Sequence, residues 1–204
     1  MTASAQNVRS TIHLRGSTQI VTEFFGFSLN SILYQRGVYP PEKFQAVKRY
    51  GLPIHVTNDN GLKNYLGQVL TQLSEWLMAG TCQKLVLVIA SANTNEVMER
   101  WVFDIETDQD AAVGTKQVEK SEKDIQNEIQ AIIRQITVSV TLLPLLQEPC
   151  TFDVLVYTDE DAPVPVSWEE SDAKLIQNAS ELPLRFFDTK IHKVQPSITY
   201  RTQD

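Results

Sequence analysis

The sequence predicts an α+β fold in which three helices pack on a small antiparallel sheet. Three stretches carry apolar residues at helical spacing, and they span about residues 17–36, 59–79 and 122–143. Three shorter runs are rich in Val and Ile or alternate between apolar and polar residues, as strands do: 84–90, 97–105 and 151–158. The last quarter of the chain follows neither pattern clearly, so the placement of a C-terminal β segment stays open.

The composition predicts one globular domain without nucleic acid or membrane as a partner. The chain has 204 residues, 42% of them apolar and 21% charged, as is typical of a domain with a real core. Its net charge of −7 and the lack of a Lys/Arg run argue against phosphate binding, which needs a basic surface. No secretory signal or membrane-spanning stretch is recognisable. We therefore expect an intracellular protein.

The first helix is expected from about Ser17 to Arg36, after a flexible arm of residues 1–12. Its apolar positions occupy much of the circumference, which indicates burial on several sides. These positions are Ile20, Val21, Phe24, Phe25, Phe27, Ile32 and Tyr34. Gly37 and the prolines that follow end the helix.

A short strand at Leu52–Thr57 is expected to lead into the second helix, with Asn58 or Asp59 as the cap. Gly80 ends that helix. Its core stripe repeats at helical spacing and consists of Leu62, Leu66, Val69, Leu73 and Leu77. The hairpin of 84–90 and 97–105 follows. On its second strand one face is expected to hold Val97, Glu99, Trp101, Phe103 and Ile105.

The polar stretch 106–120 is expected to be a mobile loop, and Ser121 with Asp124 resembles a capping box for the third helix. The core positions of that helix are Ile125, Ile129, Ile132, Ile136 and Val140. The strand Thr151–Thr158 should place Phe152, Val154 and Val156 on one face and Leu155 and Tyr157 on the other. In the acidic, proline-containing segment that follows, Trp168 is a candidate anchor for the tail.

No constellation of reactive groups points to an enzyme. Phosphate-binding glycine loops, the GxSxG elbow, HExxH and CxxC are all absent. His13, His55 and His192 show no metal-ligand spacing, and Cys82 and Cys150 are expected to be reduced, buried thiols. We expect no catalysis, no cofactor and no metal.

Four blocks in the sequence resemble the HORMA-domain family, in family order from about residue 11 to residue 201. The blocks are FFGFSLNSILYQRGVYP (24–40), KLVLVI (84–89) with ERWVFDI (99–105), IIRQIT (132–137) with LLPLL (142–146), and PVSWEES (165–171) with TKIHKV (189–194). Within that family they are most similar to the spindle-checkpoint branch. The DNA-repair branch, which serves translesion polymerase zeta, shares a stretch like ILYQRGVYP but differs in the ERWVFDI and WEES blocks.

The resemblance implies a single HORMA domain over residues 13–204, in which residues 158–204 form a mobile safety belt. In the open state the belt covers one sheet edge. In the closed state it crosses to the opposite edge and straps over a partner peptide, which pairs beside the strand 151–158. A tail of weak, ambiguous register suits two packings that differ by a few kcal/mol.

The resemblance also implies partners and site residues. The partners are a kinetochore coiled-coil adaptor, the co-activator of the anaphase-promoting complex, a BUB-related checkpoint kinase, a comet-type HORMA silencer with an AAA+ remodelling ATPase, and an open–closed self-dimer. Peptide binding is assigned to Phe152, Val154, Val156, Tyr157 and Trp168. Dimerisation is assigned to Arg134, Gln135 and Leu142, although the family often has an aromatic residue at the position of Leu142. Leu14 is assigned to holding the open state, and Ser171 and Ser180 are assigned as phosphorylation sites.

The implied location is the nucleus, kinetochore, spindle and cytoplasm. Two alternatives stay open. The chain could be a HORMA adaptor in DNA repair that captures other peptides with the same belt, or an enzyme with an unrecognised site. Peptide pulldown from mitotically arrested cells separates the first alternative from the checkpoint reading, and a turnover assay tests the second.

Overall fold

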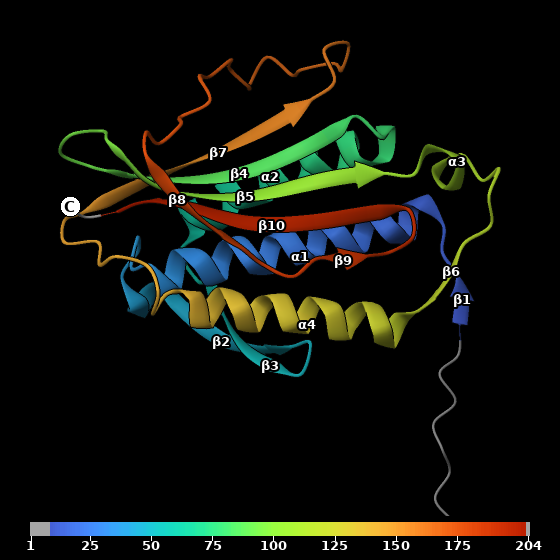
Figure 1. Cartoon of the computed structure of the whole chain (residues 1–204), viewed down its shortest axis with the longest axis horizontal. Coiled ribbons are helices and arrows are strands. Elements are labelled where there is room, and N and C mark those ends of the chain that lie inside the picture. Colours follow the sequence, from blue (N-terminus) through green and yellow to red (C-terminus); the bar gives the residue numbers. More distant parts are fainter. Residues whose placement is uncertain (1–8, 203–204) are drawn as a thin grey trace, which may run out of the picture.

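The computed structural model describes residues 9–202 and confirms the predicted α+β class (Figure 1). Its helices are α1 (Leu14–Gln35), α2 (Asn60–Ala79), the one-turn α3 (Gln109–Ala112) and α4 (Glu122–Ser139), with a 3-10 turn at Pro41–Lys43. Its strands are β1 (Arg9–Thr11), β2 (Phe44–Arg49), β3 (Leu52–Thr57), β4 (Cys82–Ser91), β5 (Val97–Thr107), β6 (Glu119–Ser121), β7 (Cys150–Thr158), β8 (Ala179–Pro183), β9 (Phe187–Asp188) and β10 (His192–Arg201).

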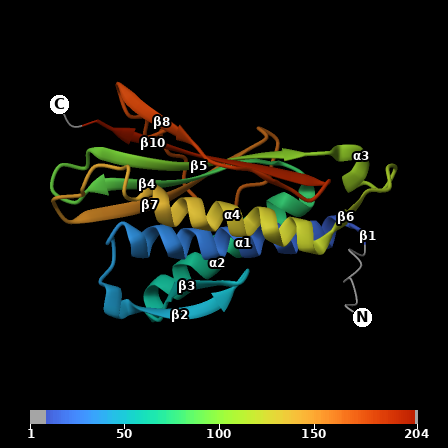
Figure 2. The same ribbon diagram turned by 60° about the horizontal axis from the view of Figure 1, so that its bottom comes forward.

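One antiparallel sheet organises the fold. Its strand order is β7-β4-β5-β10-β8, and β9 also pairs with β10. The three body strands β7, β4 and β5 come before the tail, whereas β8, β9 and β10 all belong to the tail and lie beyond β5. Helices α1 and α4 run side by side along this assembly (Figure 2). The tail is therefore part of the sheet, placed at the β5 side.

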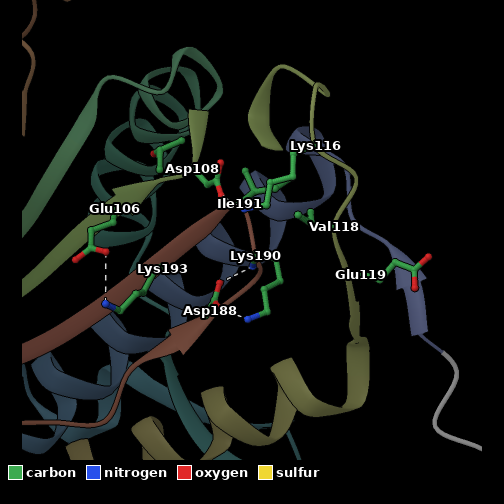
Figure 3. A pocket seen from close by; sticks show the side chains of 10 residues that line it. Glu106, Asp108, Lys116, Val118, Glu119, Asp188, Lys190, Ile191 and Lys193 are labelled. Carbon is green, nitrogen blue, oxygen red and sulfur yellow. Dashed lines mark hydrogen bonds and ion pairs between the residues drawn. The ribbon is translucent and has the colours of Figure 1, made fainter. Parts of the chain in front are cut away.

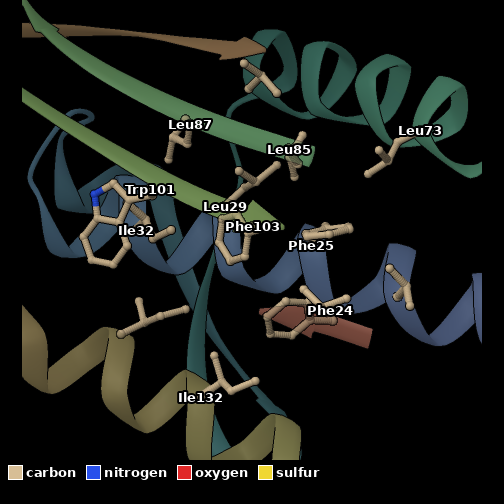
Figure 4. Packing of buried hydrophobic residues seen from close by; sticks show 14 of the residues in the cluster. Phe24, Phe25, Leu29, Ile32, Leu73, Leu85, Leu87, Trp101, Phe103 and Ile132 are labelled. Atoms are coloured by element: carbon tan, nitrogen blue, oxygen red, sulfur yellow. The ribbon is translucent and has the colours of Figure 1, made fainter. Parts of the chain in front are cut away.

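The main core lies between the sheet and the helices α1, α2 and α4. Phe24 and Phe25 of α1 meet Phe103 of β5 edge-on, with ring centroids 5.9 and 5.4 Å apart (Figure 4). The tail contributes Phe187, whose ring centroid lies 4.8 Å from that of Phe24. Edge-to-face aromatic pairs add to the free energy gained by burial alone. The tail thus shares one core with the body.

Glu99 lies on the core face as predicted, because a buried ion pair accommodates its charge. The Arg36 guanidinium, just after α1, donates from Nε to both carboxylate oxygens at 2.9 and 3.0 Å. The Trp101 indole donates to the same carboxylate at 3.1 Å. Arg36 also donates to the carbonyl of Pro144 at 2.7 Å, so the pair ties the segment after α4 to the sheet. Removing one partner would leave an uncompensated buried charge.

The local signals around α2 are confirmed. Asp59 is the N-cap, and its side chain accepts a hydrogen bond from the Leu62 N–H at 3.0 Å. The predicted apolar stripe is buried throughout. Gly80 ends the helix in the left-handed conformation at φ 70°, which a residue without a Cβ adopts at no steric cost. The strand Leu52–Thr57 also has the predicted bounds.

Three predictions about loops and termini are wrong. Helix α1 begins at Leu14 instead of Ser17, and the strand β2, Phe44–Arg49, pairs with β3 without having been predicted. Of the predicted flexible arm, residues 1–8 lie outside the described residues, but Arg9–Thr11 form β1. This strand pairs with β6 inside the stretch 106–120 that the sequence predicts to be a mobile loop. Such polar segments become ordered through long-range backbone pairing, which leaves no periodic signal.

One prediction about a strand face is wrong. Val97 packs on the face opposite Trp101, because the β4–β5 ladder shifts register: Ile89 pairs with Glu99, but Ala90 pairs with Val97. In the tail, β10 pairs continuously with β5 in this arrangement, and its residues alternate between buried and half-buried. This strand runs through Pro196, which lies between the parts paired with β8 and β9, where its missing N–H is not needed.

Candidate functional site at the two edges of the sheet

Strand β7 forms a free edge of the sheet within the described residues. It pairs with β4 on one side and is the terminal strand of the order on the other. Its side chains alternate as predicted, since Phe152, Val154 and Val156 pack on the main core while Leu155 and Tyr157 pack on the small cluster of the opposite face. An edge strand presents unpaired N–H and C=O groups to an extended peptide.

The backbone N–H of Val154 points away from β4. This follows from the hydrogen bonds at the two ends of the β4–β7 ladder: the Asp159 N–H donates to the Thr81 carbonyl at 3.0 Å, and the Pro149 carbonyl accepts from the Ala92 N–H at 2.9 Å, so the odd-numbered residues between them face β4. Because the direction alternates along an antiparallel strand, the N–H groups of Phe152 and Val156 share it. The ring of Tyr65, which belongs to α2, contacts Phe152 edge-on, with centroids 5.6 Å apart. Tyr65 therefore stands beside the free edge.

A groove of about 990 Å³ follows this edge. One wall is α2 from Lys63 to Gln72, the floor is Asp153–Leu155 of β7, and the segment 167–174 closes the other side. It is within the range of small-molecule and peptide sites. We call residues 159–178 the strap; they connect β7 to β8 without helix or strand.

The strap is attached to the body at its N-terminal end. The Trp76 indole of α2 donates to the carbonyl of Pro163 at 3.0 Å. The half-buried Trp168 packs edge-on against Trp76, with ring centroids 5.0 Å apart. Beyond Trp168 most strap residues are exposed, including Ser171, which lines the groove. Trp168 is thus placed where an anchor for the tail was expected.

The β5 edge is covered by the tail. Strand β10 pairs with β5 from His192 opposite Thr107 to Tyr200 opposite Glu99. Five apolar tail residues are at least 93% buried: Leu184, Phe187, Ile191, Val194 and Ile198. Burial of each such side chain stabilises the docked tail by about 1.5–3 kcal/mol relative to leaving that side chain exposed to water. Leaving this edge therefore requires an equivalent place for the tail to bury its apolar residues.

A buried polar network fastens the same tail to two helices. The Ser17 hydroxyl of α1 lies 2.6 Å from both the Thr189 hydroxyl and Nδ1 of His192. Nε2 of His192 lies 3.3 Å from the Leu77 carbonyl of α2. All three side-chain partners are fully buried, and desolvation lowers the pKa of His192 to about 4. The imidazole is neutral at pH 7. No local sequence pattern identifies this network, because Ser17 lies 172 and 175 residues from its two partners and Leu77 lies 115 residues from His192.

Leu14 lies at the start of α1 and packs, together with Ile12, on a small cluster of Ala111, Val118 and Ile191. Ile191 belongs to the tail, so Leu14 contacts the tail-bearing side of the fold. A cavity of about 620 Å³ opens at this junction (Figure 3). Its three lysines are each ion-paired, in the pairs Lys116–Asp108, Lys190–Asp188 and Lys193–Glu106. With Glu119 the lining holds four carboxylates against three ammonium groups, so the cavity is no site for an anion.

Helix α4 and the turn after it present the residues predicted for self-association: Arg134 and Gln135 lie on the helix, and Leu142 lies in the turn, because the helix ends at Ser139. Arg134 is exposed and Gln135 half-buried. Val138 and Leu142, which follow Arg134 at successive four-residue intervals, are 62% and 63% exposed. Exposed apolar side chains beside a cation are typical of a protein-binding face. Ser180 lies elsewhere, half-buried in β8 opposite Tyr200.

A metal-binding cluster and a membrane-spanning helix are both absent from the described residues. Within residues 9–202 no group of three or more His, Cys, Asp and Glu side chains is arranged to hold a metal ion. No helix in that range is long and apolar enough to cross a bilayer. The thiols of Cys82 and Cys150 are both free, as expected, but only Cys82 is buried as predicted, because Cys150 at the start of β7 is half-buried. Burial raises the pKa of Cys82 to about 12, so this thiol is unreactive at neutral pH.

Comparison with known proteins gives a consistent family. The HORMA domain matches residues 17–192. The mitotic spindle assembly checkpoint protein MAD2A of Dictyostelium discoideum is 60% identical over 193 residues, covering 95% of each chain. A chain from the crystal structure of the mitotic checkpoint complex is 43% identical with a TM-score of 0.84, and the match covers 92% of this chain and 99% of that one. HTP-1 of C. elegans, solved bound to the HIM-3 closure motif, shares the fold with 15% identity and a TM-score of 0.76, over 94% of this chain and 92% of that one.

Proposed function

This chain belongs to the HORMA-domain family, and we propose that it is a spindle-assembly-checkpoint effector that captures partner peptides at the β7 edge. The checkpoint proteins among its relatives supply the biological setting. The unpaired edge of β7 beside the α2 groove is the observation that carries the chemistry.

An extended peptide enters the groove and pairs as an added strand beside β7. Its backbone accepts from the outward N–H groups of Phe152, Val154 and Val156, beside the Tyr65 ring that contacts Phe152. Tyr157 lies on the opposite face of β7 and Trp168 at the strap end of the groove. Backbone pairing supplies affinity, while the groove side chains select the peptide.

The arrangement with β10 on β5 is the closed one by this account, because it leaves the β7 edge free for the peptide and runs the strap along the groove beside it. In the open arrangement the tail leaves β5 and covers the β7 edge instead, and Leu14 helps to hold that state. A peptide must supply about 5.5 kcal/mol of differential binding to move such an equilibrium from 1:99 to 99:1. Because β10, Phe187 and the His192 network must all release, exchange between the two states is slow.

In cells, a kinetochore coiled-coil adaptor holds one closed copy, which recruits open copies through Arg134, Gln135 and Leu142 of the α4 face. These close on the co-activator of the anaphase-promoting complex and delay anaphase at kinetochores and the spindle. A BUB-related kinase joins the complex, and a comet-type silencer with its AAA+ ATPase reverses it. Phosphate on Ser171 or Ser180 adds charge to an acidic tail and biases its docking. Capture needs no bond making, so the protein is an adaptor and not an enzyme.

The substitution Val156→Pro tests the capture edge. It removes an outward N–H and adds a ring to the pairing edge while keeping side-chain size, at a position where an edge strand tolerates proline. Affinity for a co-activator motif peptide, measured by titration calorimetry, should fall about a hundredfold through the lost hydrogen bond and the obstructed pairing. Val156→Thr is the matched control, because it keeps the N–H, and it should stay within about tenfold of wild type.

Two results would contradict the proposal. One is equal affinity of Val156→Pro and Val156→Thr, with both proteins folded. The other is hydrogen exchange that finds residues 160–202 equally protected with and without bound peptide. A pulldown from mitotically arrested cells checks the setting: recovery of a polymerase subunit in place of the co-activator would move the protein to the DNA-repair branch.

A further inference from the structure

We propose that Asn64, Gln68 and Gln72 of α2 hydrogen-bond the outer edge of the captured peptide, which is the edge that faces away from β7. We call these three residues the amide row. The inference rests on the proposed function in one respect, namely that an extended peptide pairs beside β7. It adds to that site a second set of contacts and the kind of peptide that these contacts select.

A peptide that pairs with β7 satisfies only one of its two edges. Successive residues of an extended strand direct their N–H and C=O groups to opposite sides, so every second peptide residue turns these groups away from β7. Figure 1 shows the strap running along β7 on the side away from β4, but the strap contains no strand that could pair with them. Enclosed backbone groups without a partner cost about as much free energy as a lost hydrogen bond. The bound peptide therefore needs donors and acceptors beyond β7.

The α2 wall of the groove carries such groups. Asn64, Gln68 and Gln72 all line the groove; the first two are exposed and Gln72 is half-buried. None of the three carboxamides hydrogen-bonds to another residue within 9–202. Each carboxamide has an acceptor oxygen and a nitrogen with two donor protons. One such side chain can therefore bond both the N–H and the C=O of a peptide residue.

The spacing of the amide row matches the repeat of an extended chain. Its members follow one another at four-residue intervals, which corresponds to a rise of about 6 Å along a helix. The backbone groups on one edge of a strand repeat every two residues, or about 6.6–6.8 Å. Over three positions the difference accumulates to about 1.5 Å, which flexible Gln side chains can absorb. A row with this spacing follows an extended backbone.

Helix α2 runs along the free edge, and Tyr65 marks the side on which the row lies. The Tyr65 ring contacts Phe152 near the start of β7, while Trp76 near the end of α2 donates to the strap just beyond β7. Gln68 and Gln72 follow Tyr65 by three and seven residues, about one and two helical turns, so they project from the same side of the helix. The row is thus placed beside the peptide along the length of the groove.

The amide row selects an extended backbone and not a particular side chain. Every residue except proline offers an N–H and a C=O, so the same contacts serve peptides of different sequence. A proline that faces the row removes the donor and loses the bond. The ligand class is therefore an extended segment without proline at the alternate positions that face away from β7.

Titration calorimetry of the full-length protein with a co-activator motif peptide tests the row. Gln68→Ala and Gln72→Ala should each weaken binding about three- to tenfold through lost hydrogen bonds, and the double variant by more. Gln19→Ala is the matched control and should bind as wild type does. It removes an exposed glutamine from α1, outside the groove.

Methylation of the peptide's amide nitrogens, one at a time, distinguishes its two edges. The positions that face β7 and those that face the row alternate, and methylation at either kind should weaken binding to wild type. In the Gln68→Ala/Gln72→Ala double variant, the penalty should shrink at one alternate set only, because the β7 contacts are intact.

The proposal is overturned if both Gln variants bind as Gln19→Ala does. It is also overturned if the methylation penalties in the double variant equal those in wild type, or shrink at every position alike. Failure of the proposed function differs: the penalties would show no alternation in wild type, and Val156→Pro would bind the peptide as tightly as Val156→Thr.

Discussion

The body strands β7, β4 and β5 form a sheet with two backbone edges, of which one is paired with the tail and the other is free. The β5 edge is paired along its length with β10 and covered by buried tail residues such as Phe187 and His192. The β7 edge has no strand beside it in the described residues and is bordered by a groove, Tyr65 and a loosely attached strap. The difference shows that the β7 edge stays available for pairing because the tail is paired with the β5 edge.

The comparison also locates the energetic cost of a switch. Leaving β5 exposes a set of buried side chains and one buried polar network. Joining β7 requires little to be removed, because the strap there is held by Trp168 and the Pro163 carbonyl. The barrier is therefore on the β5 side, and three changes probe it, from the largest expected effect to the smallest.

Phe187→Ala should have the largest effect. It removes a fully buried ring from the aromatic core, at a cost of about 3–5 kcal/mol. The tail should lose protection against hydrogen exchange while β4 keeps most of its own. Phe186→Ala is the control, because that ring is 49% exposed and its loss should cost far less. If both variants loosen the tail equally, burial of Phe187 in the core is not what holds the tail on the β5 edge.

Lowering the pH should act on the same edge through His192. Its pKa is about 4 when the tail is docked and about 6.5 when exposed. Above pH 6.5 the docked tail loses no stability relative to the released tail. Each pH unit below 6.5 lowers the stability of the docked tail by about 1.4 kcal/mol until pH 4, because the docked state must keep the ring neutral. At pH 5.5 the docked population should fall about tenfold relative to the released one.

NMR peak volumes of the tail amides at pH 7.5 and 5.5 measure this shift. The groups in contact with the imidazole, Ser17 and the Leu77 carbonyl, are uncharged, and so is Thr189, whose hydroxyl accepts from the His192 backbone N–H. His192→Gln keeps a polar side chain without a titrating proton and should remove most of the pH dependence. A tail population in wild type that stays constant over this range would show that the network does not discriminate between docked and released states.

Lys193→Gln should have the smallest effect. The Lys193–Glu106 pair joins β10 to β5, but its charged groups are 3.4 Å apart and the side chains 38% and 73% exposed. Exposed pairs of this kind contribute about 0–1 kcal/mol, so urea unfolding should change by no more than about 0.5 kcal/mol. Lys84→Gln, which breaks the matching body pair with Asp104, should behave alike. A large loss for Lys193→Gln alone would mean that surface charge, and not the core, holds the tail.

The sequence by itself determined the elements whose residues repeat locally. The stripe of α2, the Asp59 cap and the Gly80 stop are read from neighbouring residues, and so are the alternating faces of β7. Its family blocks also pointed to the HORMA fold. Local patterns do not show the face of Val97 or the continuous strand through Pro196, because a register shift and a gap between partner strands are properties of the pairing.

Only the tertiary structure decided which edge the tail covers and what holds it there. Ser17 meets His192, Glu128 meets Asp188 and Tyr65 stands beside Val154, all across elements distant in sequence. Each of these residues has an ordinary role in its own helix or strand, so no local pattern distinguishes it. The physical reason is that the tail satisfies its backbone and apolar side chains against whichever surface the folded body presents, and that surface exists only after the body has assembled.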